Sequence, residues 1–296
     1  MKQSRFIDPV TLAKINNLML VAKVVVEGFI SGIHRSPFHG FSVEFSERRE
    51  YAEGDEIKHI DWKTFAKFDK YYVKEYSAET NLKCHIVLDA SASMGYKSGG
   101  ISKLEYASYL AAALTYLMLS QQDSVGLLIF DDKIRNFIPP RGGRRHLKNI
   151  LSVLENTVPE KETNVGKVLH DLAENIRKRG LIILISDFFD SPDNIIRGLK
   201  HFLHKKHEVI AFHIVDVLEK EFNFYDMVEF IDMEKGEKVL VDTDDIRKEY
   251  RNNFSKFLGG VKAGCLLNNI TYELMETNMP LDSAMVSFLA RRERLM

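Results

Sequence analysis

Three oxygen-bearing side chains stand at alternate positions directly after one apolar run of the sequence. The run His85–Leu88 leads into Asp89, and Ser91 and Ser93 follow at the next two alternate positions. Side chains at every second position of an extended segment point to the same side. A carboxylate and two hydroxyls at the end of a buried strand would form the small oxygen cluster that Mg²⁺ prefers.

Two distant residues are expected to reach the same place. Asp187 follows a second apolar run, in the sequence LIILISDFFD, and Thr163 lies just before a helix-like segment. Ligands of open parallel sheets bind beyond the carboxyl ends of the strands, so these residues should converge with Asp89. Hydroxyls are weak neutral ligands, so a metal held mainly by them can still take a carboxylate from another molecule. Mg²⁺ suits such a site best, with Mn²⁺ or Ca²⁺ as alternatives.

The same residue types also have a structural interpretation. Asp or Ser after a strand is often only a helix cap or a turn former. For Asp89 alone the two interpretations are about equally good. The joint pattern, in which the serines, Thr163 and Asp187 all fall at expected strand ends, favours a metal site.

From residue 82 onward, apolar strand-like runs alternate with helical patterns. The expected strands are His85–Leu88, Val125–Phe130, Leu181–Ile185, Val209–Val215 and Ile270–Leu274. The expected helices are Lys103–Ser120, Arg145–Leu154, Val165–Lys178, Asn194–His204, Asp244–Leu258 and Ser283–Arg292. This alternation predicts an α/β fold of three layers, doubly wound around a mostly parallel sheet. Lys133–Ile138 follows the preceding strand too closely for a helix, so an antiparallel strand is expected there, and Glu229–Ile231 with Lys238–Val241 predicts a second hairpin.

The first 81 residues follow a different pattern. Apolar residues recur at helical spacing from Leu12 to Val26, which predicts an amphipathic helix. Phe41–Phe45 and Tyr71–Tyr76 read as extended segments. We therefore expect two domains. Residues 1–81 would form an N-terminal helix with a small β-rich extension, and residues 82–296 the α/β domain.

Composition excludes several classes of protein. Hydrophobic residues make up 45% of the chain and charged residues 28%, as in an ordinary globular protein. The net charge of −1 argues against a dedicated nucleic-acid binder. No signal peptide and no transmembrane segment is recognisable, so a cytoplasmic protein is expected.

Two blocks of the sequence carry a resemblance to known proteins. DASASM, at Asp89–Met94, resembles the metal-ion-dependent adhesion site of von Willebrand factor type A domains, whose pattern is D-x-S-x-S followed by a distant Thr and a distant Asp. The segment Arg48–Tyr76, RREYAEGDEIKHIDWKTFAKFDKYYVKEY, resembles the signature block of the domain-of-unknown-function 58 family. The C-terminal TNMPLDSAMVSFLARR resembles the ending of that family, so the likeness covers nearly the whole chain.

The resemblance implies a role for each site residue. Ser91, Ser93 and Thr163 would bind the metal directly, and Asp89 and Asp187 would act largely through water. In the family a glycine usually precedes the distant threonine, whereas Lys161 and Glu162 precede Thr163 here. Thr157 therefore stays open as the alternative ligand.

The resemblance also implies partners. The usual partner would be a MoxR-type AAA ATPase, and a client protein would supply an acidic residue to the metal. Arg48, Arg49, Asp61 and Trp62 could form a partner surface, although an internal network that docks the extension on the α/β domain explains them better.

Three functions compete on these observations. The first is a non-catalytic, metal-dependent protein-interaction module that serves an AAA ATPase in assembly or remodelling. The second is a Mg²⁺-dependent phosphoesterase that uses Asp89, Asp187 and Asp190. Against it, Ser91 stands where a haloacid-dehalogenase-like motif needs an acid, and no obvious general base or phosphate-gripping lysine accompanies the acids. The third is a structural scaffold without metal.

Overall fold

The structure, a computed structural model, describes residues 8–15, 17–33, 48–50, 72–74, 83–160, 165–176, 178–233, 236–282 and 285–286. Contacts divide the chain into two compact units. One unit contains Met1–Phe29 and Leu82–Met296, and the other contains Ile30–Asn81. This grouping places the first helices with the α/β part of the chain. The predicted division into independent domains at residue 81 stays a prediction.

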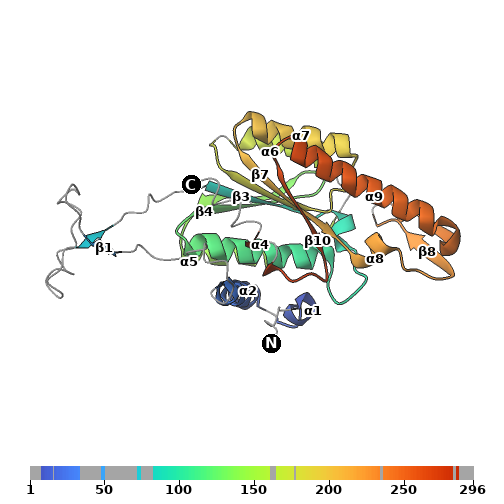
Figure 1. The fold of residues 1–296 in the computed structure, drawn as a ribbon, viewed down its shortest axis with the longest axis horizontal. Coiled ribbons are helices and arrows are strands. Elements are labelled where there is room, and N and C mark those ends of the chain that lie inside the picture. The colour runs from blue at the N-terminus through green and yellow to red at the C-terminus, as the bar shows by residue number, and fades with distance from the viewer. Residues whose placement is uncertain are drawn as a thin grey trace. The chain divides into compact units, whose positions relative to one another are not determined.

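A six-stranded sheet forms the centre of the larger unit (Figure 1). Its strands, in spatial order, are β10 (Thr271–Glu276), β7 (Glu208–Val215), β6 (Leu181–Ser186), β3 (Lys83–Asp89), β4 (Ser124–Phe130) and β5 (Ile134–Arg141). All neighbouring strands pair in parallel except β4 and β5, which are antiparallel. The expected strands and the antiparallel edge strand are therefore confirmed. Only three residues separate β4 from β5, too few for a crossover helix.

Helices cover both faces of this sheet (Figure 1). The helices α4 (Lys103–Ser120) and α5 (Arg144–Glu155) lie on one face. The helices α6 (Val165–Asn175), α7 (Pro192–His204) and α9 (Thr243–Leu267) lie on the other. The apolar sides of the second group pack on the strands in one continuous core. The three-layer α/β fold is confirmed, although α9 runs further than its predicted end at Leu258.

The strand order reverses at β3. From β3 the chain goes to β4 on one side and later returns to β6 on the other side. Leu88 pairs with Ile185, so the next residues of the two strands, Asp89 and Ser186, are neighbours at the carboxyl edge. Ligands of doubly wound sheets bind at such a reversal point, because the two crossovers diverge there.

The segment between β7 and α9 adds a small element at the same edge of the sheet. It consists of α8 (Val217–Glu221) and an antiparallel hairpin of β8 (Met227–Ile231) and β9 (Lys238–Asp242). The hairpin confirms the prediction for this segment. Aromatic rings from this element and from α9 stack together, with Phe222 in the middle of the group.

Two helices precede the sheet. Asp8 caps α1 (Pro9–Leu12), which has proline at its start. A break then separates it from α2 (Leu18–Ile33), where one continuous helix had been expected. Within the described ranges, none of the helices combines the length and the apolar character that a membrane span needs.

The smaller unit shows one antiparallel pair, β1 (Arg48–Glu50) with β2 (Tyr72–Lys74). The second strand confirms the extended segment expected at Tyr71–Tyr76. The strand expected at Phe41–Phe45, the proposed partner residues Asp61 and Trp62, and the side chains of Arg48 and Arg49 lie outside the described residues. So does most of the last expected helix, Ser283–Arg292.

Candidate functional site

Asp89 ends β3 and is completely buried. Its Oδ1 accepts a hydrogen bond from the Ser91 amide at 2.9 Å, and its Oδ2 accepts one from the Ser186 hydroxyl at 2.6 Å. The first bond is a local turn of the kind that the structural interpretation predicts. The second joins the ends of two strands that are 97 positions apart in the chain, which no turn requires.

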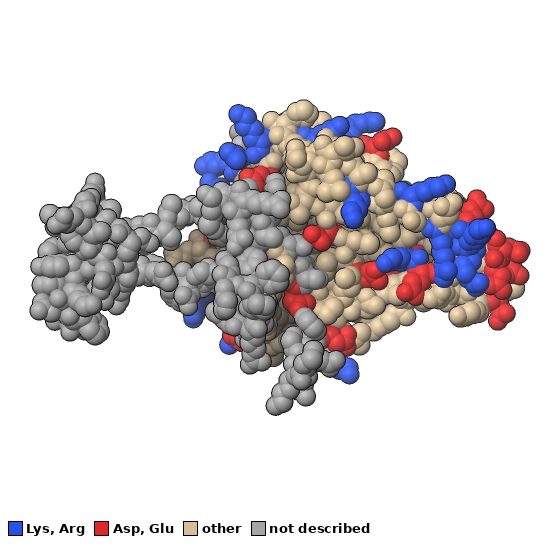
Figure 2. Space-filling model, viewed as in Figure 1, with Lys and Arg blue, Asp and Glu red and all other residues tan. Residues whose placement is uncertain are grey.

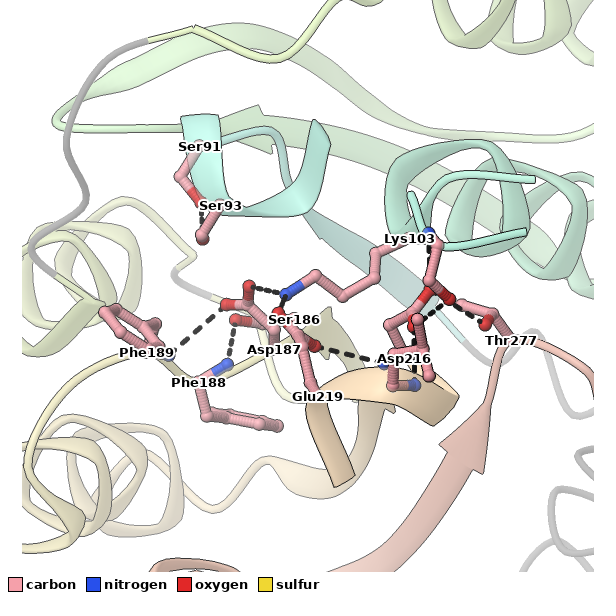
Figure 3. Close-up of polar contacts among 12 residues, drawn as sticks. Ser91, Ser93, Lys103, Ser186, Asp187, Phe188, Phe189, Asp216, Glu219 and Thr277 are labelled. Carbon is pink, nitrogen blue, oxygen red and sulfur yellow. Dashed lines mark hydrogen bonds and ion pairs between the residues drawn. The ribbon is translucent and has the colours of Figure 1, made fainter. Parts of the chain in front are cut away.

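Ser93 lies on the short 3₁₀ helix η2 (Ala92–Gly95) that follows β3, and Ser91 directly precedes this helix. Ser91 occupies the N-cap position of η2, but its side chain makes no capping hydrogen bond. Instead its hydroxyl oxygen lies 3.1 Å from the hydroxyl oxygen of Ser93 (Figure 3). The two hydroxyls therefore face each other, as their spacing predicted, rather than serving the helix end.

Asp187 directly follows β6 and is almost completely buried. Its Oδ1 accepts a hydrogen bond from the Phe189 amide at 3.3 Å. Phe188 adopts a left-handed conformation with φ of 52°, and its amide donates to the Ser186 hydroxyl at 2.8 Å. This turn buries the Phe188 ring and leaves Phe189 65% exposed beside the carboxylates. A large apolar side chain thus stands in solvent next to the buried acids (Figure 3).

The structure adds a lysine that the sequence analysis did not place here. Lys103, at the start of α4, is 1% exposed, and its Nζ lies 2.9 Å from Asp187 Oδ2 and 2.6 Å from Glu219 Oε1. Both contacts are to carboxylates, so Lys103 pairs with the acids and is not the phosphate-gripping lysine that a phosphoesterase would need. A signal was present in the sequence, because Lys103 begins a largely apolar helix, and a lysine that is buried at such a place needs carboxylate partners.

The two buried carboxyl groups have opposite pKa shifts. Burial and the neighbouring Asp187 charge raise the pKa of Asp89 to about 7, against hydrogen bonds from Ser186 and Ser91. Burial also acts to raise the pKa of Asp187, but the Lys103 ammonium, together with a hydrogen bond from Ser93 and the nearby His213, lowers it overall. Asp187 is therefore the ionised member of the pair, and no Lys, Arg or His of the described part of the chain forms an ion pair with Asp89.

The third expected hydroxyl cannot be placed. Thr163 lies outside the described residues. On one side of that gap, the Glu160 amide donates to the Ala90 carbonyl oxygen at 3.0 Å, beside the site. The alternative ligand, Thr157, donates its hydroxyl to the Val153 carbonyl oxygen at 2.7 Å at the end of α5. The Thr157 hydroxyl is therefore already used in a hydrogen bond at the end of α5.

Asp190 belongs to the start of α7. Its Oδ1 accepts from the Ser191 amide at 2.6 Å and from Asn194 Nδ2 at 3.0 Å. These bonds order the turn that leads into α7, where Ser191 is the N-cap. The carboxylate of Asp190 thus has a structural task.

The donor set of this edge fits a small divalent cation. Adjacent ligands of an octahedral ion with bonds of 2.0–2.1 Å stand about 2.9 Å apart, close to the separation of the two serine hydroxyls. A cation near Asp89 and Asp187 would also relieve the repulsion that raises the pKa of Asp89. Among the described residues, no three His, Cys, Asp or Glu side chains cluster in a way that could hold a metal.

Comparison with known proteins gives a family. A family model described as "Protein of unknown function DUF58" matches residues 47–256. Uncharacterised proteins of Mycobacterium bovis and Mycobacterium tuberculosis are each 29% identical to the chain over 233 residues. The matched regions cover 77% of this chain and 73% of each relative.

Solved structures with a similar arrangement share little sequence. The conserved hypothetical protein BatB from Bacteroides thetaiotaomicron is 13% identical, with a TM-score of 0.48 over 72% of this chain and 99% of that one. An aerotolerance-related membrane protein from Bacteroides fragilis is 18% identical, with a TM-score of 0.47 over 69% and 94%. The SpRpn10 VWA domain is 12% identical, with a TM-score of 0.41 over 69% and 93%. Residue roles cannot be transferred at this level of similarity.

Proposed function

The chain belongs to the DUF58 family, and on this premise we propose that it is a non-catalytic protein-interaction module that grips its partner through a bound divalent metal. Its larger unit has a von Willebrand factor type A-like fold, with one antiparallel strand at the edge of a parallel sheet. At a coarse level this fold supports a role in protein interaction. The metal and the partners named below are parts of the proposal.

One observation carries the proposal. The hydroxyls of Ser91 and Ser93 face each other beside the buried carboxyl groups of Asp89 and Asp187, where the strand order reverses. Mg²⁺ bound to the hydroxyls, with the carboxylates acting through water, would keep an open position. We propose that an acidic side chain of a client protein fills it.

The surroundings of the site favour recognition over catalysis. The phosphoesterase alternative needs Asp190, whose carboxylate orders the start of α7 instead. It also needs a cation that can hold a phosphate, but the Lys103 ammonium is enclosed and bonded to two carboxylates. By contrast, the exposed Phe189 ring beside the acids offers apolar area to a protein partner.

The resemblance suggests the partners. We propose that a MoxR-type AAA ATPase acts together with this module and that the client supplies the acid. In this role the module would present its client to the ATPase for assembly or remodelling.

Calorimetric titration with Mg²⁺ and Mn²⁺ tests the metal site. We expect saturable binding to the wild-type protein, and at least a tenfold loss of affinity in Asp89→Ala and Ser93→Ala. Asp131→Asn is the matched control. Asp131 is a buried acid at the end of β4, but its Oδ1 accepts from the Lys133 amide at 3.2 Å and its Oδ2 pairs with Arg135 at 3.7 Å. Absence of metal binding to the wild type would refute the proposal.

A pull-down of the MoxR-type ATPase and of client proteins tests the recognition step. Capture should require Mg²⁺, disappear in EDTA, and return when Mg²⁺ is added in excess. Asp131→Asn should capture as much as the wild type, and Ser93→Ala should capture little. Capture that is indifferent to EDTA would show that the metal does not bridge the partners.

A further inference from the structure

Lys103 joins two elements that the chain keeps far apart. Its Nζ lies between Asp187, at the end of β6, and Glu219, on α8 (Figure 3). The Tyr96 ring covers the ammonium at 5.8 Å, and the side chain is almost completely buried. The Lys103 side chain is 2% exposed and that of Asp187 is 4% exposed, whereas that of Glu219 is 24% exposed, so Lys103 is the enclosed charge that the two carboxylates share.

Glu219 does more than pair with Lys103. Its Oε2 accepts a hydrogen bond from the Asp216 amide at 3.1 Å, and the Asp216 side chain accepts from the Leu218 amide at 2.9 Å. Together these bonds form a capping box at the start of α8. The carboxylate that competes with Asp187 for Lys103 is thus the one that closes the first turn of α8.

The start of α8 is also bonded to the loop that follows the serines. Asp216 Oδ2 accepts from the Ser98 amide at 3.2 Å, and the Ser98 hydroxyl bonds Asp216 Oδ1. The same carboxylate accepts from the Thr277 hydroxyl at 3.4 Å, at the end of β10. The loop from η2 to α4 therefore reaches α8 through Ser98 as well as through Lys103.

From α8 the contacts continue to the β8–β9 hairpin. Phe222 ends α8 with a left-handed φ of 48°, and its ring stacks on Phe230 of β8 at 5.7 Å between centroids. At the tip of the hairpin, the Met233 Cε atom lies 3.3 Å from the position that a Cβ on Gly95 of η2 would take. The hairpin thus contacts η2 through Met233 and the end of α8 through Phe230.

We propose that Lys103 is a positioning residue that couples the metal site to α8 and the β8–β9 hairpin. The proposal rests on the proposed function, because it requires a cation at the serines. Lys103 would be repelled by that second cation and would have to share Asp187 with it. Its ammonium would then bond more strongly to Glu219, which would tighten the cap of α8 and order the hairpin.

The exposed face of the hairpin suggests why such coupling would be useful. Met227 of β8 and Leu240 of β9 are more than half exposed, although both are large and apolar. An element whose order depends on the metal could present this apolar face only when the site is filled.

Hydrogen exchange measured by mass spectrometry, with and without Mg²⁺, tests the coupling. In the wild type, Mg²⁺ should slow amide exchange over residues 217–222 and 227–242 by about fivefold or more, the lower end of typical couplings between sites. In Lys103→Met, calorimetry should still detect Mg²⁺ binding, but exchange over these segments should no longer respond. Lys220→Met is the matched control, because Lys220 lies next to Glu219 on α8 and pairs with Glu276 instead.

A second variant covers the case in which Lys103→Met does not fold. Glu219→Gln keeps an oxygen that can accept from the Asp216 amide but removes the charge that attracts Lys103. With Lys103 left to Asp187 alone, Mg²⁺ affinity should fall about fivefold and the exchange response should shrink. Lys220→Met should keep both at wild-type values.

The outcomes separate this inference from the proposed function. If the wild type binds no Mg²⁺, the proposed function fails and the coupling fails with it. If the wild type binds Mg²⁺ while exchange over α8 does not change, only the coupling is refuted. An unchanged exchange response in both Lys103→Met and Glu219→Gln would also refute the coupling.

Discussion

The two halves of β3 bury ionisable groups in opposite ways. His85, near the amino end, is buried, and its Nδ1 has no hydrogen-bond partner among the described residues. Burial, helped by the nearby His207 and Lys83 charges, lowers its pKa to about 4, so it is neutral at pH 7. Asp89, four residues later, accepts two hydrogen bonds, and its pKa is raised to about 7.

The difference lies in the neighbours that each group has. The histidine can remain neutral in an apolar core, which avoids burying a charge, although its Nδ1 has no hydrogen-bond partner among the described residues. The aspartate meets a second acid, hydroxyls and an ion-paired lysine, which together are costly to bury without a further cation. The carboxyl edge of the sheet therefore gathers several ionisable groups with shifted pKa values at one place, as candidate functional sites do.

Replacement of Lys103, at the carboxyl edge, should cause the largest loss of stability. Lys103→Met leaves the buried Asp187 and the partly exposed Glu219 without a cation, and because Asp187 is then a buried unpaired charge, the free energy of unfolding should fall by about 3–5 kcal/mol in EDTA. Urea unfolding measures the change. Lys220→Met removes a surface ion pair and should cost less than about 1 kcal/mol. Equal losses of unfolding free energy in the two variants would mean that the ion pairs of Lys103 contribute no more to stability than the surface ion pair of Lys220.

A smaller effect should come from the titration of Asp89 in EDTA. Its pKa is higher in the folded than in the unfolded protein, so the folded state binds more protons between pH 4 and 7. Stability should therefore fall as pH rises, by roughly 3 kcal/mol between pH 5 and 8. Urea unfolding at several pH values should show this loss in the wild type and a smaller one in Asp89→Asn. If Asp89→Asn is less stable than the wild type at pH 8, the result would favour the interpretation of Asp89 as a simple turn former.

At the amino end of β3, stability should change with pH in the opposite direction. The pKa of His85 is lower in the folded protein, so the unfolded chain binds more protons between pH 6.5 and 4. Stability should fall by roughly 2 kcal/mol for this group as pH drops from 7 to 5. His213, whose pKa is also lowered to about 4, adds to the same slope. His85→Leu should remove its own share in the same unfolding series, and an unchanged slope would contradict the pKa shift.

The smallest effect is expected at Thr157. Thr157→Val removes one hydrogen bond at the end of α5, so unfolding free energy should fall by about 1 kcal/mol. Mg²⁺ affinity should not change. A loss of affinity as large as that in Ser93→Ala would restore Thr157 as the distant ligand.

Much of the fold could be predicted from the pattern of apolar residues. Strands that are buried on both faces read as continuous apolar runs, as in Leu181–Ser186, and the crossovers between them read as helices. The limits of elements were harder to predict, because caps and packing decide them. The break between α1 and α2 and the extension of α9 to Leu267 depend on tertiary contacts, such as the bond from the Leu18 amide to Glu155 Oε1 at 3.0 Å.

The sequence by itself determined the D-x-S-x-S cluster, because residues at alternate positions of one segment need no other part of the chain to share a side. It also indicated Asp187, because an acid that ends a buried strand falls at the carboxyl edge of a parallel sheet. Only the tertiary structure decided that Ser186 would bond Asp89 and that Lys103 would lie between Asp187 and Glu219. These contacts join residues that are 84 to 116 positions apart, and the packing of α4 and α8 at one sheet edge sets them rather than any local spacing.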